Sequence, residues 1–275
     1  MNSNLPKTLI TPNPDTFGVF LGKLWKFRGL IWTFAERDLK VKYAQTLIGL
    51  GWSIVQPLTA LLIFSLVLGY LFDWVVGELP YTLHLLSGLM GWNFFAYIVH
   101  SGSFSIQESA HIIKKIYFPK SILPLSKVLV AGVELMISFL LLIPLMVYFG
   151  IAPSWKIIFL PLVLFFNALC GLSLVFLVSA LAYRKRDLFH LLPFVVYFGV
   201  WLTPVFFTMD FYPDKLATLI PFNPLTSVVE SWRWILFGKT NFEWIWGLNF
   251  LIVFLVCIVS MYFFNRKENE FSDFA

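Results

Sequence analysis

The sequence predicts an all-α integral membrane protein with six transmembrane helices, and three observations lead to that fold class. Hydrophobic residues make up 59% of the 275 positions and charged residues only 13%, whereas soluble domains carry about 25% charged residues. Six stretches reach the roughly 20 apolar residues that an α-helix needs to cross the hydrocarbon core. No pattern of alternating barrel strands is visible, so helices are the remaining way to satisfy the backbone inside a membrane.

The predicted spans follow one another between residues 52 and 264. They lie near Trp52–Phe72, His84–Phe104, Lys127–Phe149, Trp155–Ala182, Leu188–Thr208 and Trp244–Phe264. We expect residues 1–50 to form a cytoplasmic segment, residues 51–265 the six-helix domain and residues 266–275 a cytoplasmic tail. The first fifty residues hold no apolar stretch followed by a small-residue cleavage site, so we expect no signal peptide.

The distribution of Lys and Arg predicts that both termini are cytoplasmic. Six spans place both termini on one side, and that side holds all but four of the 20 Lys and Arg residues; the four are Lys156, Lys215, Arg233 and Lys239. An excess of these residues in short loops marks the cytoplasmic side. The net charge of +5 is explained by this bias and by anionic headgroups, so we expect no nucleic-acid partner.

The segment before the first span is predicted to be an amphipathic helix that lies in the membrane interface. On a helical wheel of Lys23–Lys40, apolar and aromatic side chains gather in one half and charged side chains mainly in the other. A second interpretation is a positively charged anchor that only orients the first span. These residues leave both interpretations open.

The loop between the second and third spans is predicted to contain a short cytoplasmic helix. Ser105 and Glu108 have the S-x-x-E spacing of a capping box, and Phe118–Pro119 would end a helix that starts at Ile106 and reaches about Tyr117. Such a helix, tied to two spans, could transmit motion from a soluble partner. The alternative is a solvated connector.

The segment 203–244 is too apolar for a solvated loop, and Pro204, Pro213, Pro221 and Pro224 interrupt it. We expect a pair of short helices that re-enter the outer leaflet, because broken backbone at that depth must be shielded by protein or face a water-filled cavity. Aromatic residues make up 19% of the chain, more than two interfacial belts require. Their flat faces could pack against the apolar faces of sugar rings.

Residues typical of catalysis or metal binding are scarce. The four histidines form no H-E-x-x-H motif, and "GKT" at 238–240 lacks the earlier glycine of a phosphate-binding loop, which falls at Arg233. Glu134 is the lone acid inside a span, and we expect it to pair with Lys127 or a loop cation. We predict no catalytic and no metal-ligating residue, and any ATP would be hydrolysed by a separate subunit.

Four stretches of the sequence form a recognisable set. They are "RDLKVKYAQTLIGLGWSIVQPL" (37–58), "KKIYFPKSILPLS" (114–126), "YRKRDL" (183–188), and "TPVFF" (203–207) with "PFNPL" (221–225). Together they resemble the membrane-spanning permease subunits of type-2 ABC exporters that export O-antigen, capsule or teichoic acid, over nearly the whole chain. Lys42 stands where arginine is more usual, which keeps the charge but loses the guanidinium fork.

The resemblance implies a homodimer in the bacterial cytoplasmic (inner) membrane, joined to two ATP-binding-cassette ATPase subunits. ATP and Mg would be held by those partners, no cofactor by this chain, and the cargo would be a polyprenyl-pyrophosphate-linked polysaccharide. Coupling to the ATPase would use a helix at about 105–117 and a second loop, with the residues Ser105, Glu108, His111, Lys114, Lys115, Tyr117, Arg184 and Arg186. An external gate would be formed by short helices at about 212–237, and the residues expected to serve it are Pro204, Tyr212, Pro221 and Pro224.

The same resemblance places a substrate path through the dimer. Arg37, Lys40 and Lys42 would meet the pyrophosphate at the cytoplasmic entrance, and the apolar wall would start at Trp52. The aromatic residues expected to line the channel are Trp52, Trp92, Tyr97, Tyr197 and Trp201.

Two other functions remain open at this point. One is a permease of the same fold that moves a small hydrophobic drug or a lipid, which neighbouring glycosyltransferase genes would argue against. The other is an integral-membrane enzyme of glycan assembly, which would need catalytic acids or histidines that the sequence does not offer at convincing spacing.

Overall fold

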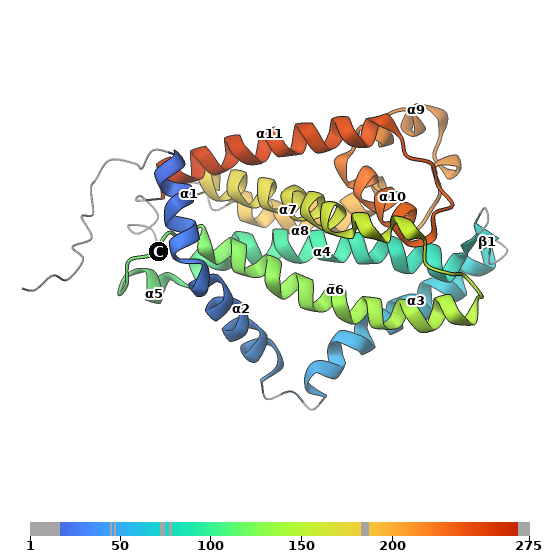
Figure 1. Ribbon diagram of the computed structural model, residues 1–275, viewed down its shortest axis with the longest axis horizontal. Coiled ribbons are helices and arrows are strands. Elements are labelled where there is room, and N and C mark those ends of the chain that lie inside the picture. Colours follow the sequence, from blue (N-terminus) through green and yellow to red (C-terminus); the bar gives the residue numbers. More distant parts are fainter. Residues whose placement is uncertain are drawn as a thin grey trace, which may run out of the picture.

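The computed structural model describes residues 17–44, 46, 48–71, 75–76, 79–182 and 187–268, which form a bundle of long helices (Figure 1). The helices are α1 (Phe17–Lys26), α2 (Arg28–Tyr43), α3 (Trp52–Leu71), α4 (Tyr81–Glu108), α5 (Ala110–Ile113), α6 (Ile122–Tyr148), α7 (Leu160–Ala182), α8 (Asp187–Gly199), α9 (Asp214–Ala217), α10 (Pro224–Phe237) and α11 (Trp244–Lys267). The remaining elements are short: 3₁₀ turns η1 (Gly49–Gly51), η2 (Trp155–Phe159), η3 (Val200–Leu202), η4 (Met209–Phe211) and η5 (Ile220–Phe222), and an antiparallel pair of strands, β1 (Val75–Val76) and β2 (Leu79–Pro80).

Five helices in the described part of the chain are long and apolar enough to cross a membrane. They run over Trp52–Tyr70, Tyr81–Glu108, Ile122–Tyr148, Trp155–Leu181 and Trp244–Lys267. Each coincides with a span predicted from the sequence. The protein is therefore a mostly helical, multi-pass membrane protein.

The remaining predicted span, Leu188–Thr208, corresponds to a shorter apolar helix that runs from Asp187 to Leu202. Thr203 is extended, with φ −125° and ψ 138°. A residue that precedes a proline is disfavoured in the α conformation because the proline ring clashes with its backbone, so Pro204 ends this helix early.

Helix α4 is the centre of the bundle and packs against α3, α6, α7, α8 and α10. Two glycines allow its close contacts with neighbouring helices. A Cβ on Gly91 of α4 would lie 2.7 Å from Cδ1 of Trp232 on α10, and one on Gly171 of α7 would lie 2.7 Å from Cγ2 of Ile98 on α4. Any larger side chain at these positions would push the helices apart.

Helices α2 and α3 form a V beside the bundle (Figure 1). Helix α2 packs along α6, and α3 returns towards α4 and α6. The V is open towards the middle of α4 and α6, and this geometry creates the candidate site described below.

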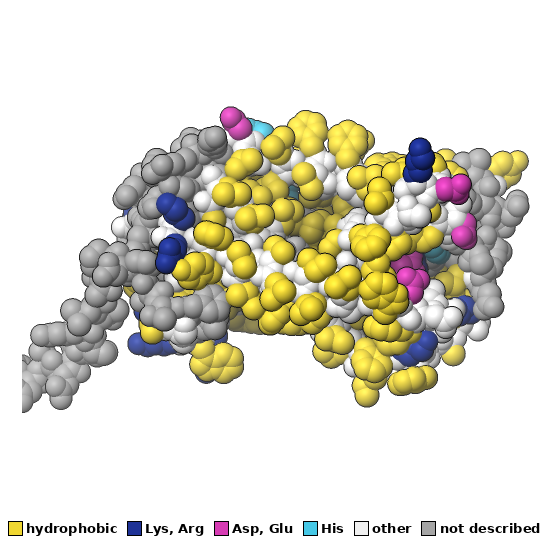
Figure 2. Space-filling model, turned by 90° about the horizontal axis from the view of Figure 1, so that it is seen from above, with side chains coloured by type: hydrophobic (Ala, Val, Ile, Leu, Met, Phe, Trp, Pro, Cys, Tyr) yellow, Lys and Arg dark blue, Asp and Glu magenta, His cyan; other side chains and the backbone are white. Residues whose placement is uncertain are grey.

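The two ends of the bundle differ in their elements. Helices α1 and α5 and the C-terminal end of α11 lie at one end, and the β1–β2 pair, α9 and α10 lie at the other (Figure 1). Figure 2 shows hydrophobic side chains over the middle of one face and charged side chains gathered towards both ends. An apolar belt between two charged ends is the expected surface of a membrane-spanning bundle.

The predicted helix over Lys23–Lys40 is two helices in the structure. The chain breaks at Phe27, which has φ −96° and ψ 13°, between α1 and α2. Phe20, Leu24 and Phe34 are buried in the core, whereas Trp25 and Trp32 are exposed, so only part of the apolar face packs on the protein itself. The helical wheel located this face but could not show the change of direction at Phe27.

The capping box predicted at Ser105 is wrong. Ser105 lies inside α4, fully buried, and its hydroxyl donates to the carbonyl of Gly102 at 2.6 Å. Helix α4 continues to Glu108, and α5 follows over only four residues. The S-x-x-E spacing was misleading because helix α4 continues through it to Glu108, and a serine inside a helix often bonds back to the preceding turn.

Candidate functional site

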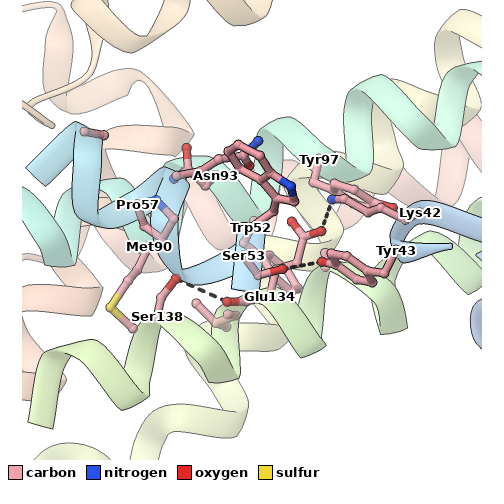
Figure 3. A pocket seen from close by; sticks show the side chains of 15 residues that line it. Lys42, Tyr43, Trp52, Ser53, Pro57, Met90, Asn93, Tyr97, Glu134 and Ser138 are labelled. Carbon is pink, nitrogen blue, oxygen red and sulfur yellow. Dashed lines mark hydrogen bonds and ion pairs between the residues drawn. The ribbon is translucent and has the colours of Figure 1, made fainter. Parts of the chain in front are cut away.

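A polar cavity of about 580 Å³ lies where the V of α2 and α3 meets α4 and α6 (Figure 3). Its walls come from all four helices: Lys42, Tyr43, Trp52, Ser53, Gln56, Pro57, Ala60, Met90, Asn93, Phe94, Tyr97, Ala131, Glu134, Leu135 and Ser138. Lys42 and Tyr43 lie at one end, and Met90, Pro57 and Ser138 at the other (Figure 3). Ligand pockets in proteins are commonly about 300–1,000 Å³ in volume, so the cavity is large enough to hold a small molecule or part of a larger one.

An ion pair between Lys42 and Glu134 crosses the cavity. The ammonium group of Lys42 also lies over the ring of Tyr97, 4.7 Å from its centroid, and 5.8 Å from that of Tyr43. Tyr43 and Ser53 share a hydrogen bond between their hydroxyls. Glu134 was expected to pair with Lys127 or a loop cation. Lys127 is not its partner, and the pair is formed instead with Lys42 at the end of α2.

Lys127 belongs to a second ion-pair group. Its Nζ lies 2.8 Å from Oδ2 of Asp38 on α2 and 3.5 Å from Oε2 of Glu108 at the end of α4. Arg37 donates from Nε and Nη2 to Oδ1 of Asp38 at 3.0 and 2.7 Å. This group joins α2, α4 and α6 at the end of the bundle that carries α5.

The three cations predicted to meet pyrophosphate therefore each have a carboxylate partner. Arg37 pairs with Asp38, Lys42 with Glu134, and Lys40 with Glu36 at 2.6 Å. Any phosphate that binds here must compete with these carboxylates.

Of the five aromatic residues predicted to line a channel, the structure brings two to the cavity, Trp52 and Tyr97. Trp92 is buried in the core of the bundle, and Tyr197 and Trp201 are exposed on α8 and η3. The described chain therefore separates these aromatic residues into three environments.

The predicted coupling residues lie at the α5 end of the bundle. His111, Lys114, Lys115 and Tyr117 are exposed on or after α5, while Ser105 is buried. Arg184 and Arg186 lie outside the described residues. The exposed group forms a polar surface on the connection between α4 and α6.

The "TPVFF" segment that follows η3 is not helical, yet side chains satisfy much of its backbone. Tyr212 donates its hydroxyl to the carbonyls of Trp201 and Thr203 at 3.1 and 3.2 Å. Asn223 donates to the carbonyl of Leu202 at 3.2 Å. Inside a membrane protein, non-helical backbone is tolerated only where such partners cover it.

Tyr81 and Arg233 complete this cover from α4 and α10. Tyr81 donates to the carbonyl of Phe206, and Nη2 of Arg233 donates to the carbonyls of Val205 and His84, at 3.2–3.3 Å. Arg233 is only 2% exposed and forms an ion pair with Glu230 at 2.6 Å. Burial lowers the pKa of the Arg233 guanidinium from its ordinary value, and the neighbouring Glu230 opposes that shift.

The predicted gate residues surround the same segment. Pro204 is buried. The hydroxyl of Tyr212 donates to the carbonyls of Trp201 and Thr203, and burial raises the pKa of this hydroxyl. Pro221 accepts a 2.8 Å hydrogen bond from Asn249 of α11, and Pro224 is the first residue of α10, where Asn223 caps the backbone N–H of Leu225.

Sequence reasoning missed the buried role of Arg233, which it counted as a loop cation, and the polar residues Gln56, Asn93 and Ser138 of the cavity wall. A signal existed for the three polar residues, because each lies inside a predicted span, where a polar side chain is costly unless it has a polar neighbour. In the described part of the chain, no group of three or more His, Cys, Asp or Glu residues could hold a metal ion.

Comparisons with known proteins all match this chain to transport proteins. A family model described as "ABC-2 type transporter" matches residues 29–237. The O-antigen export system permease protein RfbA of Klebsiella pneumoniae is 30% identical over 250 residues, 89% of this chain and 94% of the relative. A protein of the same name from Myxococcus xanthus is 26% identical over 91% of this chain and 97% of its own length. The polysialic acid transport protein KpsM of Escherichia coli is 24% identical over 79% of this chain and 84% of its own.

Proposed function

This chain belongs to the ABC-2 type transporter family, and from that premise we propose that it is the transmembrane subunit of an ATP-driven polysaccharide exporter. It acts in the bacterial cytoplasmic membrane. The observation that carries the proposal is that relatives named as O-antigen export permeases align over 94% and 97% of their own lengths. Alignment over whole chains argues for a shared task and not only a shared module.

We propose further that two copies of the chain enclose the path and that two ATPase subunits bind their cytoplasmic face. The support for the ATPase is the family itself and the lack of a nucleotide-binding loop in this sequence. The support for a glycan cargo is the name of each relative. The most specific part of the proposal is that the glycan is carried on polyprenyl pyrophosphate, and this part rests on the resemblance alone.

The orientation is proposed from charge: the α5 end of the bundle faces the cytoplasm, six spans cross the membrane, and α8 is the fifth of them. The segment 212–237 at the opposite end is proposed as the external gate. What supports a gate is that Tyr212, Asn223 and Arg233 of this segment hold the backbone at residues 202–205 through a few side-chain hydrogen bonds, which can break without unfolding a span.

Coupling to the ATPase is proposed for the surface around α5, with His111, Lys114, Lys115 and Tyr117. The support is that Glu108, at the end of α4 beside this surface, contacts Lys127, which also contacts Asp38 of α2. A displacement of the connection between α4 and α6 would therefore be transmitted through Glu108 and Lys127 to α2.

Arg37, Lys40 and Lys42 are proposed to receive the pyrophosphate at the cytoplasmic entrance, where it would displace their carboxylate partners. Replacing Arg37 and Lys42 by glutamine should reduce glycan export, measured as surface polysaccharide in complemented cells. Lys215→Gln, on the opposite end, is the control and should leave export unchanged. Normal export in the Arg37→Gln, Lys42→Gln variant would contradict this entrance.

The first test of the overall function is purification of the tagged chain from its native membrane in mild detergent. We expect a soluble ATPase with the GxxxxGK[ST] motif to co-purify in equal amount. Deletion of the gene should trap glycan inside the cell, and the wild-type chain should restore export. Recovery with glycan-synthesis enzymes and without an ATPase would contradict the proposal and favour an enzyme of glycan assembly.

A further inference from the structure

We propose that the cavity between α2, α3, α4 and α6 is a binding site for uncharged sugar residues of the exported glycan. This inference rests on the proposed function but names a site within one copy of the chain. Three properties of the described cavity wall carry it: unpartnered amides, a compensated charge and aromatic faces.

The first property is the pair of carboxamide side chains, Gln56 on α3 and Asn93 on α4. Both line the cavity, both lie in helices apolar enough to span a membrane, and both are exposed. Among the described residues neither has a hydrogen-bond partner. An amide left without partners in hydrocarbon costs several kcal/mol, so these side chains need either water or a polar ligand, and each offers donors and an acceptor to neighbouring hydroxyls.

The second property is the charge of the wall, which carries one cation and one anion that are already paired, Lys42 and Glu134. Their side chains keep 37% and 28% exposure, so both can still reach a ligand in the cavity. While this pair is formed the charges on the described wall cancel, which suits an uncharged occupant. A hydroxyl can accept from Lys42 and donate to Glu134 with the pair intact, and hydrogen bonds to charged groups are the stronger ones.

The third property is the presence of aromatic rings beside these polar groups. Trp52, from the first turn of α3, and Tyr97, from α4, lie next to Lys42 and Asn93 in Figure 3. Aromatic rings bury large apolar areas, and a sugar ring has an apolar face of C–H groups as well as a polar edge. An occupant that needs both kinds of contact matches this wall better than a lipid chain, which would leave the amides of Gln56 and Asn93 without hydrogen-bond partners.

The position of the cavity suits a path for glycan. Its Lys42 end adjoins the proposed pyrophosphate entrance, and its Met90, Pro57 and Ser138 end lies further along the bundle (Figure 3). A glycan that follows its lipid carrier past Arg37 and Lys40 would reach this cavity next.

The test places the photo-cross-linking amino acid p-benzoylphenylalanine at position 56 or position 93 of the full chain, in its native host with its ATPase. The matched control carries it at Leu62, which is on the same helix as Gln56, 60% exposed and outside the cavity. The host's own polysaccharide is the probe. After irradiation the purified chain is examined for an acid-labile gain in mass, and we expect glycan at positions 56 and 93 and none above background at position 62.

A second measurement separates ligand contact from a structural role. With the cross-linker at position 56, Asn93→Leu should reduce the glycan yield roughly 2- to 10-fold, the effect of losing about one net hydrogen bond, and Asn93→Gln should restore part of it. If Asn93→Leu does not yield folded protein, Gln56→Leu with the cross-linker at position 93 takes its place.

The outcomes distinguish the site from the function. Normal export together with cross-links only to lipid, or to a second copy of this chain, would overturn the sugar site and leave the exporter intact. Failure of the wild-type chain to restore export in the deletion strain would overturn the exporter and the site together.

Discussion

Lys127 is a charged side chain held almost entirely inside the bundle, and only 7% of it is exposed. Its partner Asp38 is 12% exposed, so both charges of the pair have lost most of their water. Removing one member of a buried pair leaves the other uncompensated, at a cost of about 3–5 kcal/mol. The position of α2 on α6 therefore depends on this contact.

We predict that Lys127→Met destabilises the purified protein by up to about 3–5 kcal/mol, since Asp38 loses its buried partner and keeps only the hydrogen bonds from Arg37. Lys127→Met combined with Asp38→Asn should cost less than the sum of the two single changes. Melting of the detergent-solubilised chain, followed by size-exclusion chromatography, measures both. Lys40→Met is the control, because its pair with Glu36 is exposed and should contribute less than about 1 kcal/mol; additive losses would contradict the coupling.

We predict that Arg233 stabilises the segment 203–213, which lies at the end of the bundle opposite α5. Arg233→Met removes the donor to Val205 and His84 and strands Glu230, so the segment 203–213 should become sensitive to protease added from outside the cell. Arg233→Lys keeps the charge but lacks the planar fork that reaches several acceptors, and should be intermediate. Lys215→Met, at an exposed position, is the reference. If the segment 203–213 is as resistant to protease in Arg233→Met as in this reference, the hydrogen bonds from Tyr81, Tyr212 and Asn223 are enough to hold it and the prediction is wrong.

The pairing of individual side chains could not be predicted from the sequence. Glu134 was singled out correctly as an acid that needs a partner, but Lys42 lies 92 positions away and was assigned to phosphate. Partner choice depends on which helices pack together. Helices that are apolar on nearly all sides carry no stripe to show this.

At the scale of single helices, the contact between α4 and α7 depends on the absence of a side chain at Gly171. Cγ2 and Cβ of Ile98 would lie 2.7 and 2.9 Å from an added Cβ. Both are close to the backbone of α4 and cannot swing away as the end of a flexible side chain would.

Gly171→Ala is therefore expected to destabilise the protein by about 1–3 kcal/mol through overpacking. Gly132→Ala is the matched control on α6, because an added Cβ there meets nothing within 4 Å, and alanine should favour the helix by roughly 0.5–1 kcal/mol. The melting temperatures of the two variants should move in opposite directions. A shift of the same sign in both variants would mean that helix propensity, and not the contact with Ile98, determines the stability of Gly171→Ala.

The starts of two helices could be predicted from the sequence because an apolar run begins at each of them. Trp52 and Trp244 start α3 and α11 as the sequence indicated, since apolar runs begin there. Ser105 failed as a helix start because the tertiary contacts of α4 extend the helix through it, and local capping chemistry is too weak to compete with a buried turn.

At the scale of the whole molecule, the fold class followed from composition, whereas the cavity did not. Apolar runs of about 20 residues have one stable form in a bilayer. The cavity needs the angle between α2 and α3, and no sequence rule predicts that angle.

The early end of the helix formed by α8 and η3, at Leu202, has a consequence for the surrounding lipid. Its 13 α-helical and 3 further residues extend over about 25 Å, shorter than the roughly 30 Å of an average hydrocarbon core. In the proposed six-span arrangement this hydrophobic mismatch compresses the bilayer beside α8, at a cost of a fraction of a kcal/mol per Å. Transport in reconstituted vesicles should then fall as the acyl chains of the lipids lengthen, which would make bilayer thickness a regulator of this exporter.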